Sequence, residues 1–361
     1  MLTYKRKLRL NKAQEARIGS WIGTCRFVYN MGLEIRREAW KNKQQQVHKY
    51  ELMKQLKPIK NIEWIKDVPH QCLEKVIVRL DNAYKSFFKG AGFPKWATKG
   101  QFNSIQFKQD AFDCIRATNT SVRLPKIGKL KIIKDTEIIG KIKNASIIKE
   151  PTGYFVCITT DAKKSIHSQN ESQILGLDMG VRYFAVDSNG VKFENPKHFK
   201  TFEAKLRIEN RSLARKKKGS NSWKRQLKKV ALLNHKIANI RKDFLHKLST
   251  QIAKNNHTVI LEDLNIKGMV KSRLSKSISD CGWGIFRLML EYKTNVVAVN
   301  PKHTSQTCND CGAKDAKSRI SQSKFVCTAC GVESNADENA AKNILRKGIP
   351  FIRQREAIAC A

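Results

Sequence analysis

The sequence has few acidic residues and lacks a long apolar run. Its 361 residues include 31 Asp and Glu against 70 Lys and Arg, which leaves a formal net charge of +39. A charge of that size destabilises a compact fold by self-repulsion unless an anionic partner neutralises it, and the usual partner is the phosphate backbone of a nucleic acid. No apolar run approaches the roughly 20 residues that span a bilayer, so we expect a nucleic-acid partner and no membrane segment.

The N-terminus lacks the apolar segment of a secretory signal. It reads MLTYKRKLRL, in which basic residues interrupt the apolar ones. We therefore expect the protein in the cytoplasm, where thiols stay reduced and disulfides are rare. The ten cysteines are then expected to be metal ligands or packed residues.

Several common catalytic motifs are also missing. The sequence has no Gly-rich phosphate loop, no HExxH motif, no recognisable Ser/His/Asp arrangement and no paired-histidine HUH motif with a Tyr nucleophile. It also shows no internal repeat and no long low-complexity tract. None of these chemistries therefore competes with a site built from carboxylates and metal ions.

The first half of the chain predicts a β domain with a helical insertion. Residues 1–10 predict a basic strand, and apolar residues at helical spacing over 11–42 predict a long helix with Asn11 as its N-cap. A second amphipathic stretch over 69–90 predicts another helix. From about 102 to 161, alternating or β-branched runs separated by Gly, Pro and Asn predict a small β-barrel or sandwich.

The second half predicts an α/β domain, because strand-like and helical segments alternate along it. Strands are expected at ILGLDMGV (174–181), HTVILEDLN (257–265) and VVAVNP (296–301). The segment SDCGWGIFRLMLEYK (279–293) is expected to be one helix.

Two strongly basic helical segments occupy 202–256, after the first of these strands. The second carries one apolar stripe, and its opposite face is almost all Lys and Arg. A solvated charged face is the alternative, but the excess of one sign is too great for salt bridges along the helix. We therefore expect a helical hairpin that follows phosphates. The stripe consists of Ile237, Ile240, Phe244, Leu248 and Ile252.

Two C-x2-C pairs near the C-terminus give the most specific local signal. Fifteen residues separate the pairs, and a Gly that permits a tight turn follows each of them. Two such knuckles bring four thiolates around one tetrahedral ion, which favours a structural Zn2+ site over two redox pairs. The other cysteines, apart from the terminal Cys360, lie in or beside apolar patterns and are interpreted as packed residues. The predicted zinc ligands are Cys308, Cys311, Cys327 and Cys330.

Two strands end on carboxylates. Asp178 shares a strand face with Gly176 and Gly180, which clears space for a metal ion or a phosphate, although an Asp near a strand end more often makes a turn. Glu262 and Asp263 follow the apolar run of the 257–265 strand. Adjacent strand residues point to opposite faces, so only one of the two acids can face a given site, and the spacing does not choose between them.

A third carboxylate, Asp337, opens the last predicted helix. It shares a helix face with Ala340, Ala341 and Ile344, small or apolar residues that let the helix lie close to a sheet. The alternative role is a first-turn acid that favours the helix dipole. Taken together, three such acids on two strands and one helix can hold two Mg2+ ions about 3.5–4 Å apart, which is a cradle for phosphodiester cleavage.

Six segments of the second half occur in a distinctive order: GLDMGVRYFAV, ILEDLNIKGMVKS, SISDCGWGIF, TSQTCNDCG, CTACG and ADENAAKNIL. In that order they resemble the signature segments of TnpB proteins, the OrfB products of insertion sequences, which are RNA-guided nucleases related to type V CRISPR effectors. Three segments of the first half also fit this family: CRFVYN, AYKSFF and VRLPKIGKLKI.

The resemblance implies which residues do chemistry. The family's split RuvC-like triad, on an RNase H fold, falls on Asp178, Glu262 and Asp337, which favours Glu262 over Asp263. Catalytic Mg2+ would be held by these three acids. A zinc ribbon, structural in role, would be inserted between the second and third acid. Ala336 stands where family members often have Arg, and the 291–300 link is shorter than usual.

The resemblance also implies a domain layout of α/β plus β class. It consists of a wedge-like β-barrel domain (1–10 and 95–165), a helical recognition insertion (11–94), a RuvC-like nuclease domain (172–305 and 332–350), a zinc ribbon (306–331) and a C-terminal tail (351–361).

The implied function is an RNA-guided, Mg2+-dependent DNA endonuclease of a transposable element. Its partners would be a guide RNA from the element end and the target DNA, with base pairing reading the sequence; the oligomeric state is left open. A nuclease-silent, RNA-guided repressor is the alternative, and its mark would be the loss of one of the acids. A transposase that joins DNA ends ranks last, because the HUH motif is missing.

Overall fold

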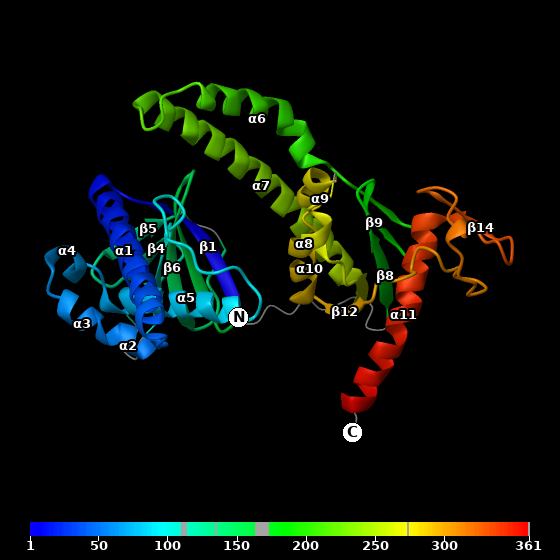
Figure 1. The fold of residues 1–361 in the computed structure, drawn as a ribbon, viewed down its shortest axis with the longest axis horizontal. Coiled ribbons are helices and arrows are strands. Elements are labelled where there is room, and N and C mark those ends of the chain that lie inside the picture. Colours follow the sequence, from blue (N-terminus) through cyan, green and yellow to red (C-terminus); the bar gives the residue numbers. More distant parts are fainter. Residues whose placement is uncertain (110–113, 134–135, 163–172, 273, 360–361) are drawn as a thin grey trace. The chain divides into compact units, whose positions relative to one another are not determined.

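A computed structural model describes residues 1–361 except 110–113, 134–135, 163–172, 273 and 360–361, and of 355–359 it describes only the backbone. The chain divides into two compact units, Met1–Lys164 and Ser165–Ala361 (Figure 1). The sequence also predicts a polar linker between the two halves, AKKSIHSQNESQ (162–173), and that segment lies almost wholly outside the described residues. No helix in the described parts is long and apolar enough to cross a membrane.

Unit 1 combines an antiparallel sheet, whose strands differ in length, with a helical segment inserted after its first strand. The seven-stranded sheet has the order β2-β6-β7-β1-β5-β4-β3, so β2 and β3 are its two ends. The antiparallel β domain with its helical insertion agrees with the prediction, while closure into a barrel stays a prediction. The strands are β1 (Leu2–Arg9), β2 (Ser104–Lys108), β3 (Arg116–Ala117), β4 (Ser121–Leu124), β5 (Gly128–Ile132), β6 (Ile142–Glu150) and β7 (Gly153–Thr160).

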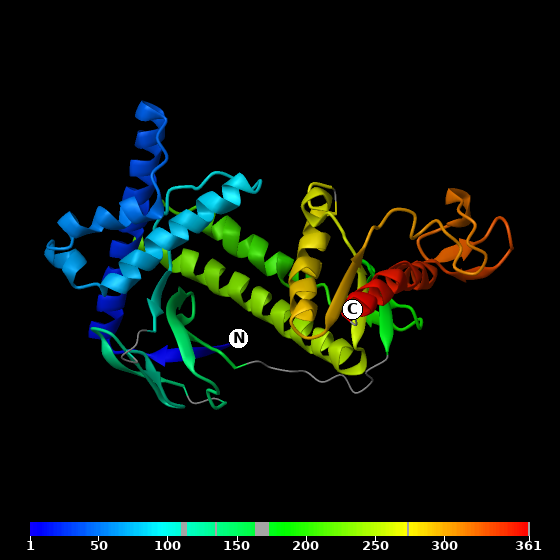
Figure 2. The ribbon, with the colours of Figure 1, turned by 90° about the horizontal axis from the view of Figure 1, so that it is seen from below.

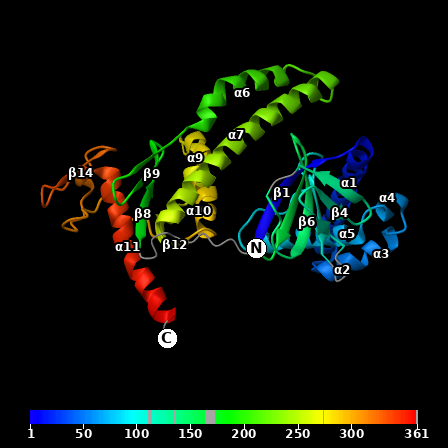
Figure 3. The same ribbon diagram turned by 180° about the vertical axis from the view of Figure 1, so that it is seen from behind.

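The helices of unit 1 lie beside this sheet, and Figure 3 shows α1 and α5 with its strands. The predicted cap of α1 is confirmed: Asn11 Oδ1 accepts from the backbone N of Gln14 at 2.8 Å, and the Gln14 side chain accepts from the backbone N of Asn11. Trp21 is fully buried and packs near Phe107 of β2. The helices are α1 (Lys12–Lys43), α2 (Lys49–Lys54), α3 (Leu56–Ile59), α4 (Glu63–Lys66) and α5 (His70–Phe88).

Unit 2 is built on a five-stranded sheet of order β10-β9-β8-β11-β12. The three strands β8, β11 and β12 run parallel, and β9 and β10 continue the sheet in antiparallel pairing. This sheet contains the three strands predicted from sequence. Its strands are β8 (Ile174–Met179), β9 (Tyr183–Asp187), β10 (Lys192–Glu194), β11 (Thr258–Glu262) and β12 (Asn295–Val299).

Helices cover both faces of this sheet. Leu175, Leu177 and Val259 form one core with residues of α7 and α10, whereas Ile260 and Val297 pack on the other side with Ile344 of α11. Figures 1 and 2 also show α6 and α7 side by side, as the predicted basic hairpin. The helices are α6 (His198–Ala214), α7 (Asn221–Asn255), α8 (Ile266–Met269), α9 (Ser275–Cys281), α10 (Trp283–Glu291) and α11 (Ala336–Ala359).

The single helix predicted over 279–293 is wrong, because the structure has two helices there. Gly282 lies between α9 and α10 with φ of +69° and is the C-cap of the first and the N-cap of the second. That left-handed conformation ends an α-helix and is one that Gly adopts without a Cβ penalty. Sequence periodicity continues across the break, which is why it was missed.

The last helix extends beyond the boundary expected from sequence. α11 runs through Ala359 and contains Pro350, so residues 351–359, expected as a tail, continue the helix. Gly176 and Gly348 let it lie close to the sheet: an added Cβ at Gly176 would overlap the carbonyl oxygen of Ala341, and one at Gly348 would overlap the side chain of Ile260. The close packing of α11 expected from its small residues is thus present, with Ala340 and Ala341 almost fully buried.

Candidate active site and metal centre

The carboxyl ends of two parallel strands bring the first two predicted acids together. β8 and β11 pair in parallel with Leu177 opposite Leu261, so the next residues, Asp178 and Glu262, are neighbours across the pair. Asp178 lies two residues after Gly176, on the sheet face that α11 covers. The parallel register therefore places these acids side by side, although 83 other residues separate them along the chain.

The third acid reaches the same place from the start of α11. Asp337 lies in the first turn of that helix, where its backbone N and that of Glu338 donate to Asn335 Oδ1 at 3.0 and 3.2 Å. Burial raises the pKa of Asp178, and the negative charges of Glu262 and Asp337 add to the rise, which brings that pKa to about 7. The three acids therefore form one electrostatically coupled cluster.

Glu262 and its neighbour Asp263 have different surroundings. Burial raises the pKa of Glu262, while the Thr304 hydroxyl, which donates to its Oε1, and the charges of Lys347 and Arg319 oppose that shift. Asp263 instead accepts from Arg287 of α10 at 2.6 Å, on the other side of the sheet. Only Glu262 of the two acids therefore faces the cluster.

Basic side chains surround Asp337. Burial raises its pKa, and the nearby charges of Arg319, Arg182 and Lys192 oppose the rise. Arg319 is the direct neighbour, with Nη2 3.5 Å from Asp337 Oδ1. Sequence reasoning assigned no role to Thr304 or Arg319: Thr304 opens the quoted TSQTCNDCG segment, whereas no pattern in the sequence marked Arg319.

Four cysteine sulfurs gather in the segment between β12 and α11. All four Sγ atoms lie within 4.8 Å of one another, with Cys308–Cys330 at 3.8 Å and Cys311–Cys327 at 3.5 Å. A tetrahedral ion with Zn–S bonds of about 2.3 Å sets its sulfurs about 3.8 Å apart, so the arrangement fits a structural zinc. Among the described residues, no other group of three or more His, Cys, Asp or Glu ligands is as tight.

The backbone of both knuckles has the turn predicted from their glycines. Gly312 and Gly331 have φ of +76° and +73°, and each donates its N–H to the carbonyl of the first cysteine of its pair at 3.0 Å. Backbone N–H groups of Cys330 and Ala329 lower the pKa of the Cys327 thiol, whereas side-chain contacts with Cys311 and Cys327 raise the pKa of Cys330. A short ribbon, β13 (Lys324–Val326) and β14 (Glu333–Asn335), flanks the second pair.

Two buried asparagines of α11 connect the four-cysteine centre to the acid cluster. Asn339 Nδ2 donates to the carbonyl of Thr307 at 2.8 Å, and its Oδ1 accepts from the backbone N of Asn309 at 2.9 Å. Asn343 Nδ2 donates to the carbonyls of Thr304 and Thr307. These bonds fix the chain segment that carries Thr304, and hence the hydroxyl that orients Glu262. Both asparagines lie in the quoted ADENAAKNIL segment, but their role depends on contacts that spacing does not reveal.

Comparisons with known proteins agree with this architecture. The family described as "Probable transposase" (OrfB_IS605) matches residues 156–273, and the "Cas12f1-like, TNB domain" matches 283–344, which contains the four cysteines. A "Helix-turn-helix domain" of the same family matches 1–45, where the structure has one strand and one unbroken helix, β1 and α1.

Curated relatives cover nearly the whole chain. The "Putative RNA-guided DNA endonuclease InsQ" of Escherichia coli (strain K12) is 34% identical over 96% of this chain and 92% of its own length. A protein of Streptomyces pristinaespiralis, named "Putative RNA-guided DNA endonuclease", is 28% identical over 93% and 86% of the two chains. A solved structure, "Structure of the mini-RNA-guided endonuclease CRISPR-Cas_phi3", shares the fold with a TM-score of 0.51 at 10% identity, over 96% of this chain and 92% of that one.

The chain is thus one of the proteins that mobile elements encode and that are named as transposases or RNA-guided endonucleases. It belongs to the OrfB family of insertion-sequence proteins, also called TnpB.

Proposed function

We propose that the chain is an RNA-guided DNA endonuclease of a transposable element and that Asp178, Glu262 and Asp337 are its catalytic residues. The observation that carries the proposal is the convergence of these acids: after burial, which is the larger cause, the charges of Glu262 and Asp337 also raise the pKa of Asp178, although the three lie far apart in the sequence. The name of the Escherichia coli relative supports the choice of a DNA substrate and an RNA guide.

The chemistry of the donor set favours Mg2+ at this cluster. Carboxylate oxygens are the ligands that Mg2+ prefers, and a pair of ions would stabilise the charge on the attacking and leaving oxygens of a phosphodiester. The negative charges of Glu262 and Asp337 help to raise the pKa of Asp178 to about 7, so the three carboxylates repel one another. Bound cations would reduce that repulsion.

The neighbouring residues have distinct roles in this proposal. Thr304 holds one oxygen of Glu262 and leaves the other for a cation. Arg319 balances the charge of Asp337, and Lys347, whose charge acts on Glu262, lies on the same helix as Asp337. Arg319 also offers guanidinium donors, which suit a phosphate oxygen of the substrate strand.

We assign the domains accordingly. Residues 172–305 and 332–350 would form the RuvC-like nuclease domain, and 306–331 the zinc ribbon, whose Zn2+ ligands would be the four cysteines. Residues 1–10 and 95–165 would be the wedge-like domain, and 11–94 the recognition insertion. The basic α6–α7 hairpin and the net charge of +39 support contact with guide RNA and target DNA.

The test is cleavage by the purified chain with its copurified RNA, on a plasmid that carries the matching target. We expect cutting in Mg2+ and none in EDTA. Glu262→Gln should reduce the cutting rate at least about 100-fold, because a lost charge stabiliser in the transition state typically costs that much. Asp263→Asn is the matched control, one residue away and paired with Arg287 instead, and it should cut like the parent.

Two results would contradict the proposal. Cutting by Glu262→Gln at the parental rate would show that Glu262 is not a catalytic residue. Tight, guided DNA binding by the parent with no cutting in Mg2+ would instead favour the nuclease-silent repressor.

A further inference from the structure

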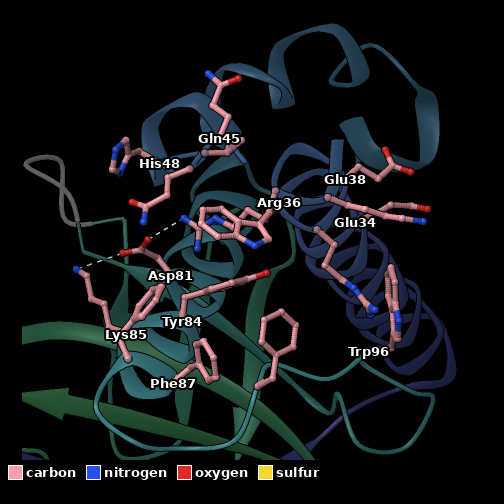
Figure 4. Close-up of a pocket in the computed structure, with 17 residues that line it drawn as sticks. Glu34, Arg36, Glu38, Gln45, His48, Asp81, Tyr84, Lys85, Phe87 and Trp96 are labelled. Carbon is pink, nitrogen blue, oxygen red and sulfur yellow. Dashed lines mark hydrogen bonds and ion pairs between the residues drawn. The ribbon is translucent and has the colours of Figure 1, made fainter. Parts of the chain in front are cut away.

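A groove in unit 1 is not used by the acid cluster or the cysteine centre. Its volume is about 820 Å3, and it lies between the C-terminal part of α1, the segment that follows α1, the end of α5 and residues 93–96. Figure 4 shows aromatic rings and basic side chains facing this space from several of these elements. A volume of this size is within the range of about 300–1,000 Å3 in which proteins bind small organic groups.

Exposed aromatic side chains form its walls. The exposed fraction is 56% for Trp40, 72% for Phe88, 44% for Phe93 and 42% for Trp96. Scattered apolar residues on a surface are ordinary, but a contiguous group of large rings around one hollow indicates a binding surface. Phe93 is held in place by edge contacts with neighbouring rings, for example 5.2 Å between the centroids of Phe93 and Phe87. Phe93 is therefore held in position before any ligand arrives.

Cations lie directly on these rings. The Arg37 guanidinium is 5.5 Å from the ring of Trp96 and 6.0 Å from that of Phe93. Arg36 donates to Asp81 at 2.8 Å and stacks 4.8 Å from the Tyr84 ring, so its charge is paired within the wall. Arg37 is therefore the cation that faces the rings of the groove.

The combination suits a particular chemistry. Flat rings stack on flat bases, cations on the rim attract phosphates, and polar side chains such as Gln45 and His48 can bond to base edges. An apolar, uncharged peptide would cover the rings but leave the Arg37 guanidinium without an anionic partner, whereas a nucleotide offers both a ring and a phosphate. The carboxylate of Asp81 pairs with Arg36 through one oxygen and with Lys85 through the other, and its remaining lone pairs can accept from a ribose 2′-hydroxyl, which DNA lacks.

We propose that this groove binds an unpaired RNA nucleotide, whose base stacks on Trp40 and Phe88 and whose phosphate contacts Arg37. The proposal rests on the function proposed above and adds to it a place where the protein holds single-stranded RNA, independently of base pairing with the target. It concerns residues of unit 1 alone, so it can fail without affecting the assignment of the acids.

The experiment measures the affinity of the full-length chain, purified free of nucleic acid, for an unstructured oligoribonucleotide. Fluorescence anisotropy gives the affinity across a series of salt concentrations, with duplex RNA and single-stranded DNA of the same sequence as further arms. An oligoribonucleotide that contains 2-aminopurine reports stacking through quenching of its fluorescence. The variants are Trp40→Ala and Phe88→Ala, at exposed positions where truncation leaves the core intact. Trp64→Ala, an exposed Trp outside the groove, is the matched control.

We expect each groove variant to weaken binding of single-stranded RNA about 5- to 150-fold, the fold-change that corresponds to a lost base–aromatic stack. Quenching of 2-aminopurine should decrease, the dependence on salt should persist, and Trp64→Ala should bind like the parent. Duplex RNA should bind all proteins equally.

Three results would overturn the proposal. Unchanged affinity and quenching in both groove variants would show that no base stacks there. An equal loss of affinity for single-stranded DNA and for single-stranded RNA in the groove variants would show that the groove does not prefer ribose. A change in oligomeric state by sedimentation, with RNA affinity unchanged, would identify the groove as a contact between two copies of the chain. None of these results depends on cleavage, whereas a parent protein that binds RNA but does not cut in Mg2+ would count against the nuclease assignment alone.

Discussion

Arg319 places its Nη2 3.5 Å from Oδ1 of Asp337, although the two residues come from different parts of unit 2. Arg319 follows the short 3-10 helix Ala316–Ser318 inside the cysteine-bearing segment, and Asp337 opens α11. The cysteine-bearing segment and the acid cluster are therefore in contact through a charged pair. A change in the fold of the cysteine-bearing segment is therefore expected to alter the position or the pKa of Asp337.

Replacing Arg319 tests this contact. Arg319→Gln removes the positive charge that opposes the raised pKa of Asp337, so that pKa should rise further. A hydrogen bond to a charged group is worth about 1.5–3 kcal/mol, which corresponds to a decrease in cutting rate of about 10- to 150-fold. The measurement is single-turnover cleavage as a function of pH. Lys317→Ala, an exposed cation of the same segment, is the control, and an equal loss there would indicate a general charge effect.

Removing a thiol from the four-cysteine centre tests the metal. Cys308→Ser should lower the zinc content from about one ion per chain toward none, because a closed tetrahedral site requires all its ligands. The ribbon should then become sensitive to protease. Elemental analysis and limited proteolysis measure both effects. Cys157→Ser, in β7 of unit 1, should retain zinc. Full zinc content in Cys308→Ser would exclude this cysteine as a ligand.

The raised pKa of Asp178 predicts a pH dependence of stability in the absence of divalent ions. The folded pKa, about 7, exceeds the ordinary value of 3.8, so the folded state binds the extra proton and the parent protein loses stability as pH rises from about 4 to 7. Asp178→Asn cannot ionise and should be more stable than the parent by on the order of 1–4 kcal/mol at pH 7.5, with a smaller difference at pH 5.5. Urea unfolding at both pH values in EDTA measures this.

Adding Mg2+ should reduce that difference, because cations stabilise the ionised cluster of the parent and bind the variant less well. A difference that is the same at pH 5.5 and 7.5 would contradict the origin assigned here, since it would not come from the titration of Asp178.

The close contact between α11 and the sheet predicts that one added methyl group at Gly176 lowers the stability of the fold. Gly176→Ala would push α11 away from β8, because the added Cβ overlaps the helix backbone. Overpacking of this kind typically costs about 1–3 kcal/mol, and the shift of α11 should also displace Asp337 and lower cutting. Gly23→Ala, in α1 with open space around the new Cβ, should be neutral or slightly stabilising. Thermal unfolding of both variants makes the comparison, and a Gly176→Ala protein as stable as the parent would contradict the close packing.

Local patterns in the sequence predicted the elements and the ligands that chemistry requires. Helical spacing and the N-cap residue Asn11 identified α1, and apolar runs identified β8, β11 and β12, because each depends on neighbours within a few residues. The two C-x2-C pairs predicted the cluster of four thiols for the same reason. The three acids were likewise candidates from their positions at strand ends and a helix start.

Relations between distant segments could not be predicted in this way. Periodicity continues through Gly282, so the break between α9 and α10 depends on a backbone conformation that spacing does not encode. Thr304, Arg319 and the two asparagines of α11 gain their roles only when separate segments pack together. The charge of one acid reaches another only after β8, β11 and α11 meet, because electrostatic coupling depends on distance in space and on burial, neither of which is a property of the chain before it folds.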